Sequence, residues 1–149
     1  KVNILNKSLI KDFNISNPKI AISSLNPHAG EEGEVGKEEI NIIIPAVNDL
    51  KNNGINATGP LPADSLFNKD NLKEYDARLC MFHDQALIPI KTLDFYNGIN
   101  FTSGLSFIRT SPDHGTAFSI SGKNLANPDS FISSVKQAVV IAKNRNYYG

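Results

Sequence analysis

The chain has 149 residues, of which 40% are apolar and 20% charged, a composition typical of one globular unit with an ordinary core. Its 15 basic and 15 acidic residues cancel, which excludes the basic surface expected of a nucleic-acid-binding protein or of one held on an anionic membrane. No segment reaches the roughly 20 apolar residues of a membrane span, and the start lacks a secretory signal, so the cytoplasm is the expected compartment.

Residues Lys1 to Asn17 have weak periodicity, as though the chain began partway through a larger domain. The first predicted strand is Ile20–Leu25, an apolar run that ends at Asn26-Pro27 and leads into a loop at His28. A helix is predicted next, because apolar residues recur at helical spacing. Pro45 lies inside this pattern and should kink the helix, since proline lacks a backbone N–H. Its stripe consists of Ile40, Ile43, Ile44, Val47 and Leu50.

Two more strands are predicted at Ile55–Thr58 and Ala77–Phe82. The first runs into a Gly-Pro turn, after which Asp64 stands where either a helix N-cap or a site carboxylate would be expected. The second is followed by a predicted loop, His83–Gln85. Residues Asn100–Arg109 alternate polar and apolar beside glycines, which indicates a strand and turn lining a site.

The last predicted helix begins near Pro128. Its apolar stripe consists of Ile132, Val135, Val139 and Ala142. Strands that alternate with helices predict an α/β layer, with ligand-binding loops at the strand ends. The single Cys80 lies in an apolar run, so an inert core thiol is expected rather than a nucleophile.

The three histidines, His28, His83 and His114, all lie in predicted loops. A lone histidine is more often a surface or hydrogen-bonded residue than a metal ligand. His28 and His83, however, each follow a predicted strand, so both imidazoles should project at the same edge of a parallel sheet. This placement favours one divalent metal site.

Polar side chains that could bind an anionic substrate also lie in predicted loops or at strand ends. They are the carboxylates of Asp64 and Asp84, the cations Lys91 and Arg109, and the amide of Asn100. Arg109 would bind a phosphate or carboxylate in fork geometry and Lys91 as a point charge, although solvated surface cations are the simpler alternative.

The stretch Ser111–Ala117 could open a helix or turn whose backbone N–H groups cradle an anion or a nucleotide. Serine hydrolases, P-loop NTPases and HExxH metalloproteases are excluded, because their motifs do not occur.

Four motifs in this order, Leu25–Glu31, Gly59–Asp64, His83–Gln85 and Arg109–Ala117, resemble the 4-phosphohydroxy-L-threonine dehydrogenase family. The likeness runs from about residue 19 to the end. Members of that family are considerably longer on the amino-terminal side, so the resemblance implies that residues 1–149 are the carboxyl-terminal part of a longer dehydrogenase.

The resemblance implies a role for each candidate site residue. His28 and His83 match two of three metal-binding histidines, and the third is expected upstream of this sequence. Lys91, Asn100 and Arg109 match substrate-contacting residues. Asp64 matches a carboxylate beside the site, which either supports the metal ligands or handles a proton. The metal would be zinc, magnesium or cobalt, in a site shared between the two subunits of a homodimer.

The stretch from His114, Gly115, Thr116 and Ala117 to Asn127 also resembles the adenosine-binding loop of isocitrate and isopropylmalate dehydrogenases. This resemblance implies the layered sheet with flanking helices of those enzymes, and NAD or NADP as cofactor. The expected reaction is oxidation of 4-phosphohydroxy-L-threonine followed by decarboxylation, in pyridoxal 5'-phosphate biosynthesis. Two alternatives stay open: a related dehydrogenase of another four-carbon phosphorylated hydroxy acid, and a non-catalytic metal- or nucleotide-binding domain.

Overall fold

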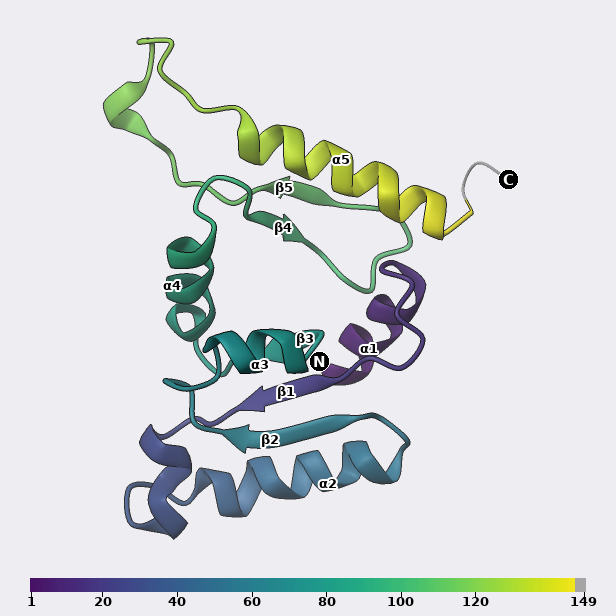
Figure 1. Cartoon of the computed structure of the whole chain (residues 1–149), viewed down its shortest axis with the longest axis vertical. Helices are drawn as coiled ribbons and strands as arrows, with labels where there is room; N and C mark the ends of the chain where they lie inside the picture. Colours follow the sequence, from purple (N-terminus) through teal and green to yellow (C-terminus); the bar gives the residue numbers. More distant parts are fainter. Residues whose placement is uncertain (147–149) are drawn as a thin grey trace.

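The computed structural model describes residues 1–146, which form two connected sheets with helices packed beside them (Figure 1). In the first sheet, β1 (Ile20–Ser23) lies between β2 (Ala57–Leu61) and β3 (Ala77–Leu79). Both neighbours run parallel to β1, and Ile20 is opposite Ala57 on one side and Ala77 on the other. The predicted α/β layer with a parallel sheet is therefore confirmed.

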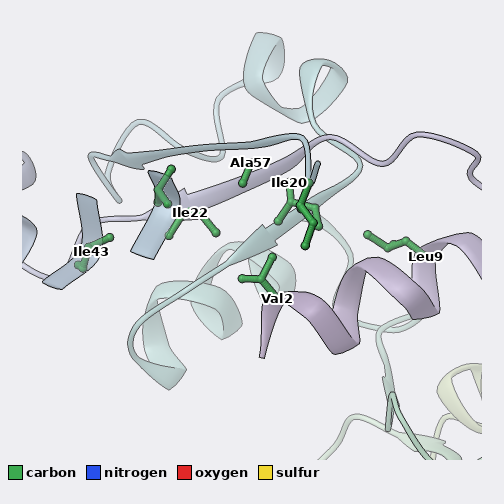
Figure 2. Packing of buried hydrophobic residues seen from close by; sticks show 8 residues of the cluster. Val2, Leu9, Ile20, Ile22, Ile43 and Ala57 are labelled. Carbon is green, nitrogen blue, oxygen red and sulfur yellow. The ribbon is translucent and has the colours of Figure 1, made fainter. Parts of the chain in front are cut away.

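The core is built around β1, all four of whose residues are buried. Helix α1 (Val2–Lys11) packs Val2 and Leu9 into the same cluster as Ile20 and Ile22, as Figure 2 shows. Burial of an aliphatic side chain of this size contributes about 1.5–3 kcal/mol. Helix α1 therefore completes the core, although its weak periodicity did not predict a helix.

The helix predicted around Pro45 is present but changes pitch along its length. A wide, π-type turn at Glu39–Ile43 leads into α2 (Ile44–Asn52), which lies beside β2 (Figure 1). Pro45 stands in the first turn of α2, where its missing N–H costs little, so the pitch changes just before the expected kink. The wide turn also rotates the predicted stripe: Ile43 and Val47 are buried, whereas Ile40 and Ile44 are exposed.

The strand and turn predicted at Asn100–Arg109 form part of a second, antiparallel sheet, whose pairing was not predicted. It consists of β4 (Ile99–Phe101) and β5 (Thr110–Pro112), and α5 (Asp129–Asn144) packs against it (Figure 1). The connection at 102–109 is too short for the crossover helix that a parallel pair requires, so the chain returns antiparallel. The hydroxyl of Thr110 donates to the carbonyl of Ser134 at 3.0 Å and fixes this sheet to α5.

Two further helices are present, one in a stretch for which no element was predicted and one that begins where the sequence predicted a loop. Helix α3 (Lys69–Glu74) is N-capped by Asn68, whose side chain accepts hydrogen bonds from the Asp70 and Asn71 amides. Asp64 is therefore not the cap of this helix. Helix α4 (His83–Leu93) includes the predicted loop His83–Gln85 as its first turn, because the Gln85 side chain accepts hydrogen bonds from the Met81 and Phe82 amides.

Helix α5 buries a different face from the predicted one. Its buried residues are Ser130, Ser134, Ile141 and Ala142, whereas Ile132, Val135 and Val139 are exposed. Serine side chains suit the buried face because α5 approaches the second sheet closely and bonds to it. Among residues 1–146, no helix combines the length and apolar character that a membrane span requires.

Candidate functional site

The loops that follow the three parallel strands meet at one edge of the sheet. They line a hollow of about 310 Å³ whose walls include His28 after β1, Asp64 after β2 and Gln85 after β3. The Gln85 side-chain amide donates to the Ser24 carbonyl at 3.1 Å, which ties the end of β1 to the start of α4. Ligands of parallel α/β sheets bind at this edge, so the hollow is the candidate active site.

His28 is carried on a tight left-handed turn that begins at Pro27. The residues from His28 to Gly33 all have positive φ. This turn brings the Glu31 carboxylate against Nδ1 of His28. The hydrogen bond to Glu31 and its negative charge raise the pKa of His28, and Asp64 adds a smaller attraction. With Nδ1 held, Nε2 is the ring nitrogen available to a ligand.

His83, the other predicted metal ligand, stands at the start of α4 and is exposed. Its Nδ1 lies 2.8 Å from Oδ1 of Asp84, so it has the same type of carboxylate partner as His28. His83 does not line the hollow beside His28. Within residues 1–146, no three His, Cys, Asp or Glu side chains gather closely enough to hold a metal ion.

Lys91 lies in the last turn of α4, not at a strand end or in a loop as the sequence predicted. Its Nζ is 3.0 Å from Oδ2 of Asp113, donates to the Asp113 carbonyl and lies 5.2 Å from the centre of the Phe95 ring. Only about a quarter of each of the two charged side chains is exposed. Any anion that binds Lys91 must therefore share it with Asp113.

Asn100 and Arg109 lie on one face of the second sheet. Phe101 is opposite Thr110 in the antiparallel ladder, so Thr102 is opposite Arg109, and residues two apart point to the same side. The guanidinium of Arg109 donates to the Thr102 hydroxyl at 2.9 Å, which agrees with this register. Because Thr110 faces α5, Asn100 and Arg109 are on the opposite, exposed side.

Four of the five residues predicted to bind a nucleotide line a second hollow, of about 410 Å³. These four are His114, Gly115, Ala117 and Asn127, and Thr116 is not part of the lining. The remaining walls are aromatic and apolar except for Ser130, with Phe95 and Tyr96 from the segment after α4. The stretch Ser111–Ala117, which was predicted to open a helix or a turn, leads into a short turn at Phe118–Ile120.

Polar groups in this second hollow have defined hydrogen-bonding roles. Nδ1 of His114 lies 3.0 Å from the Gly115 carbonyl and donates to it, so in the neutral ring Nε2 is the acceptor. The side-chain oxygen of Asn127 accepts from the Asp129 amide at 2.7 Å and stabilises the start of α5. The NH₂ group of the Asn127 side chain takes no part in this hydrogen bond.

Several residues that build these hollows were missed from the sequence. Glu31 and Gln85 stand beside the predicted ligands, and Phe95 and Tyr96 line the nucleotide hollow as an edge-to-face pair with centres 5.3 Å apart. Gln85 bonds to the Phe82 amide as the third residue of a capping box does, but Phe82 has no side-chain acceptor to complete that motif, so the sequence carried no signal for the position of Gln85. Cys80 is only half-buried, so its predicted place in the core is wrong. Burial still raises the pKa of its thiol, the direction expected of an unreactive cysteine.

Comparison with known proteins gives a consistent result. The family model described as "Pyridoxal phosphate biosynthetic protein PdxA" matches residues 1–138. A 4-hydroxythreonine-4-phosphate dehydrogenase from Caulobacter vibrioides is 54% identical over 139 residues, which are 93% of this chain and 42% of that protein. The chain thus spans about two fifths of the length of this relative.

Solved structures also match. A crystal structure of 4-hydroxythreonine-4-phosphate dehydrogenase from Klebsiella pneumoniae superposes with a TM-score of 0.83 at 43% identity, covering 95% of this chain and 42% of that one. A terephthalate 1,2-cis-dihydrodiol dehydrogenase from Burkholderia xenovorans LB400 superposes with a TM-score of 0.71 at 28% identity, covering 93% and 44%. Both matches extend over the two sheets described above.

Proposed function

Because this chain belongs to the PdxA family of pyridoxal phosphate biosynthetic proteins, we propose that it supplies part of the active site of a 4-phosphohydroxy-L-threonine dehydrogenase. The reaction is oxidation of the substrate's secondary hydroxyl with NAD or NADP, followed by loss of carbon dioxide. The observation that carries the proposal is the meeting of His28, Asp64 and Gln85 at the carboxyl ends of the parallel strands. This is the edge where α/β enzymes bind their substrates.

The residues present fit a divalent metal ion in their chemistry. His28 and His83 each have Nδ1 next to a carboxylate, Glu31 and Asp84, an arrangement that orients an imidazole and makes its Nε2 a better metal ligand. Zinc, cobalt and magnesium remain candidates. A bound ion would act as a Lewis acid on the substrate hydroxyl and later on the ketone oxygen, while the nicotinamide accepts the hydride.

Asp64 is the residue we assign to proton handling. Its exposed carboxylate lines the same hollow as His28 and is close enough to influence the pKa of that histidine. A carboxylate at this position can accept the hydroxyl proton from a substrate in the hollow, directly or through one water. Beside Asp64, the side chain of Gln85 donates to the Ser24 carbonyl and so holds the end of β1 against the start of α4.

We assign substrate binding to Lys91, Asn100 and Arg109. The exposed guanidinium of Arg109 uses one nitrogen on Thr102 and can present its other edge to a phosphate in fork geometry. Asn100 stands on the same face of the second sheet. Lys91 contributes a point charge and shares it with Asp113.

The second hollow fits the adenosine half of NAD or NADP. Its aromatic and apolar walls suit the faces of an adenine ring, and Nε2 of His114 can accept a hydrogen bond from the adenine amino group. Gly115 and Ala117 leave room for a close approach of the ligand to the backbone.

We further propose that the complete site forms in a homodimer, with a third metal ligand from outside residues 1–146. Zinc sites that catalyse reactions use three protein ligands, and the described residues supply two imidazoles. Large apolar side chains that a partner would cover are exposed on α4 and α5, among them Ile88 and Val139.

The second candidate is a related dehydrogenase with another substrate. The match to a terephthalate 1,2-cis-dihydrodiol dehydrogenase favours it, since that protein is named for a different substrate and has the same fold over this segment. Terephthalate is a dicarboxylate, so its dihydrodiol is an anion as well, and the cations Lys91 and Arg109 suit either substrate. A direct comparison of substrates is therefore needed to separate the two candidates.

A chimera tests the proposal. Residues 1–149 would be joined to the portion of the Caulobacter vibrioides relative that they do not match. Its NAD and NADP reduction would be measured with 4-phosphohydroxy-L-threonine, four-carbon sugar-acid phosphates and a cis-dihydrodiol, with and without each divalent metal. Metal-dependent turnover that prefers 4-phosphohydroxy-L-threonine is expected. Preference for another substrate would favour the second candidate, and metal-independent turnover would remove the metal from the proposal.

A further inference from the structure

A buried carboxylate lies beneath the loop that carries His28. Glu39 is 1% exposed and stands in the wide turn before α2. Its Oε1 accepts hydrogen bonds from the Leu25 and Asn26 amides, each at 2.8 Å, and its Oε2 accepts from the Asn26 side-chain amide at 2.8 Å. Both oxygens of the carboxylate therefore accept hydrogen bonds, which offset the free-energy cost of burying its negative charge.

The backbone that follows His28 is also closely packed around this carboxylate. A Cβ added at Gly30 would lie 2.8 Å from Oε2 of Glu39, and a Cβ added at Gly36 would lie 2.2 Å from the Asn26 amide nitrogen. Gly30 also has a φ of +81°. The loop before His28 and the loop after it are therefore both shaped around Glu39 and Asn26.

We propose that Glu39 is a positioning residue that fixes the backbone next to His28, and so sets where the imidazole of His28 lies in the candidate active site. The proposal rests on the proposed function only for the role of His28 as a metal ligand. Glu39 itself does not line the hollow, and it acts through Leu25 and Asn26.

The substitution Glu39→Gln isolates this role, since it keeps the shape and removes the second acceptor. The remaining side-chain oxygen is required by the two backbone amides, so the new NH₂ group must face the NH₂ group of Asn26. Two donors then oppose each other in a buried place. Glu38→Gln is the matched control, because exposed Glu38 also accepts from the Asn26 amide, at 2.7 Å, and a glutamine there can turn its oxygen toward Asn26.

Amide hydrogen exchange and ¹⁵N spectra of the histidine rings would be recorded on the metal-free chain. In Glu39→Gln we expect the Leu25 and Asn26 amides to exchange at least about tenfold faster, because losing the bond from the Asn26 side chain and opposing two donors makes this segment open more often. The Ser24 amide, which bonds to the Leu61 carbonyl, should exchange at its wild-type rate. The ring nitrogens of His28 should shift while those of His114 stay unchanged, and Glu38→Gln should change none of these signals.

Two outcomes would overturn the proposal. One is a Glu39→Gln chain with wild-type exchange at Leu25 and Asn26 and an unchanged His28 ring. The other is equal acceleration of exchange at Ser24 and at the buried strand β1, which would make Glu39 a residue of general stability. None of these readouts uses metal or turnover. If the His28 ring responds as expected and the chimera fails to require metal, the positioning role stands and the metal assignment fails.

Discussion

At the scale of single residues, the two predicted metal histidines share a feature that their sequence positions did not predict. Each imidazole has Nδ1 against a carboxylate that is close in sequence, Glu31 for His28 and Asp84 for His83. A carboxylate partner fixes the tautomer and leaves Nε2 as the ligand atom. The local sequence thus sets the orientation of each ring, whereas the distance between the two rings depends on the meeting of β1 and α4.

Replacing His83 by alanine in the chimera tests its assignment as a metal ligand. Loss of a ligand should exceed the roughly 10- to 100-fold loss of metal affinity that follows removal of an outer-shell partner. Metal content by elemental analysis and turnover should fall together. His114→Ala is the control: it should raise KM for NAD and leave metal content unchanged. If His83→Ala retains full metal occupancy, His83 is not a ligand.

Arg109→Lys tests the fork geometry proposed for substrate phosphate. Lysine keeps the positive charge but cannot hold Thr102 and two phosphate oxygens at once, so kcat/KM should fall by at least tenfold, about 1.4 kcal/mol. Lys136→Arg, the reverse change on the exposed side of α5, should have no effect. Near-normal kinetics for Arg109→Lys would place Arg109 outside the site.

The sequence predicted which residues surround the candidate site better than it predicted their partners. His28 and Asp64 could be placed at one sheet edge, because both follow strands of a parallel sheet. The ion pair of Lys91 with Asp113 could not be predicted, since it joins the end of α4 to a loop that follows the second sheet. Contacts of this kind depend on tertiary packing, which periodicity does not report.

At the scale of elements, the existence and order of the strands in the first sheet were predicted, and the helix faces were predicted poorly. The bounds of β2 were wrong, because the strand continues through Gly59 and Pro60, where a turn was expected. β1 is buried throughout, so its apolar run was an unambiguous signal. In α5 the apolar stripe at Val135 and Val139 is exposed, and small polar residues such as Ser134 face the sheet instead. An apolar stripe indicates a face that must be covered, but the sequence does not say whether the cover belongs to the same chain.

A buried ion pair joins the first helix to the last one. Asp12, just after α1, accepts hydrogen bonds from Arg145, just after α5, at 2.5 Å to Nε and 3.0 Å to the terminal nitrogen, and both side chains are less than 5% exposed. Asp12→Asn removes the negative charge that this buried guanidinium contacts, so the free energy of unfolding should fall by about 3 kcal/mol. Urea unfolding measures it, and the exposed Asp49→Asn should change stability by less than about 0.5 kcal/mol.

The same pair predicts a pH dependence. Burial alone would raise the pKa of Asp12, but hydrogen bonds from Arg145 and Ser8 hold this pKa below its ordinary value of 3.8. A carboxyl whose pKa is lowered in the folded state stabilises the fold fully above its unfolded pKa, and this contribution is lost as pH falls through the folded value. The stability difference between wild type and Asp12→Asn should therefore be constant near neutral pH and shrink only below about pH 4. A difference that shrinks between pH 8 and 6 would assign it to another group.

At the scale of the whole molecule, the two sheets each bring part of the chemistry. The parallel sheet carries His28 and Asp64 at its strand ends, while the antiparallel sheet presents Asn100 and Arg109. Helix α4 connects them, with His83 in its first turn and Lys91 in its last (Figure 1). The arrangement distributes the proposed metal, substrate and cofactor groups over both halves, so the relative placement of the sheets determines whether they can act together.

The last prediction concerns residues 1–149 as an isolated chain, which should not reduce NAD with 4-phosphohydroxy-L-threonine at any metal concentration. The reason is physical: within residues 1–146 no three ligating side chains come together, and a site with two imidazoles binds a divalent ion weakly and leaves it unfixed. Turnover should appear in the chimera, and native mass spectrometry would show whether each preparation is one chain or an assembly. Robust metal-dependent turnover by a preparation that contains residues 1–149 alone would show that no third protein ligand from elsewhere is required.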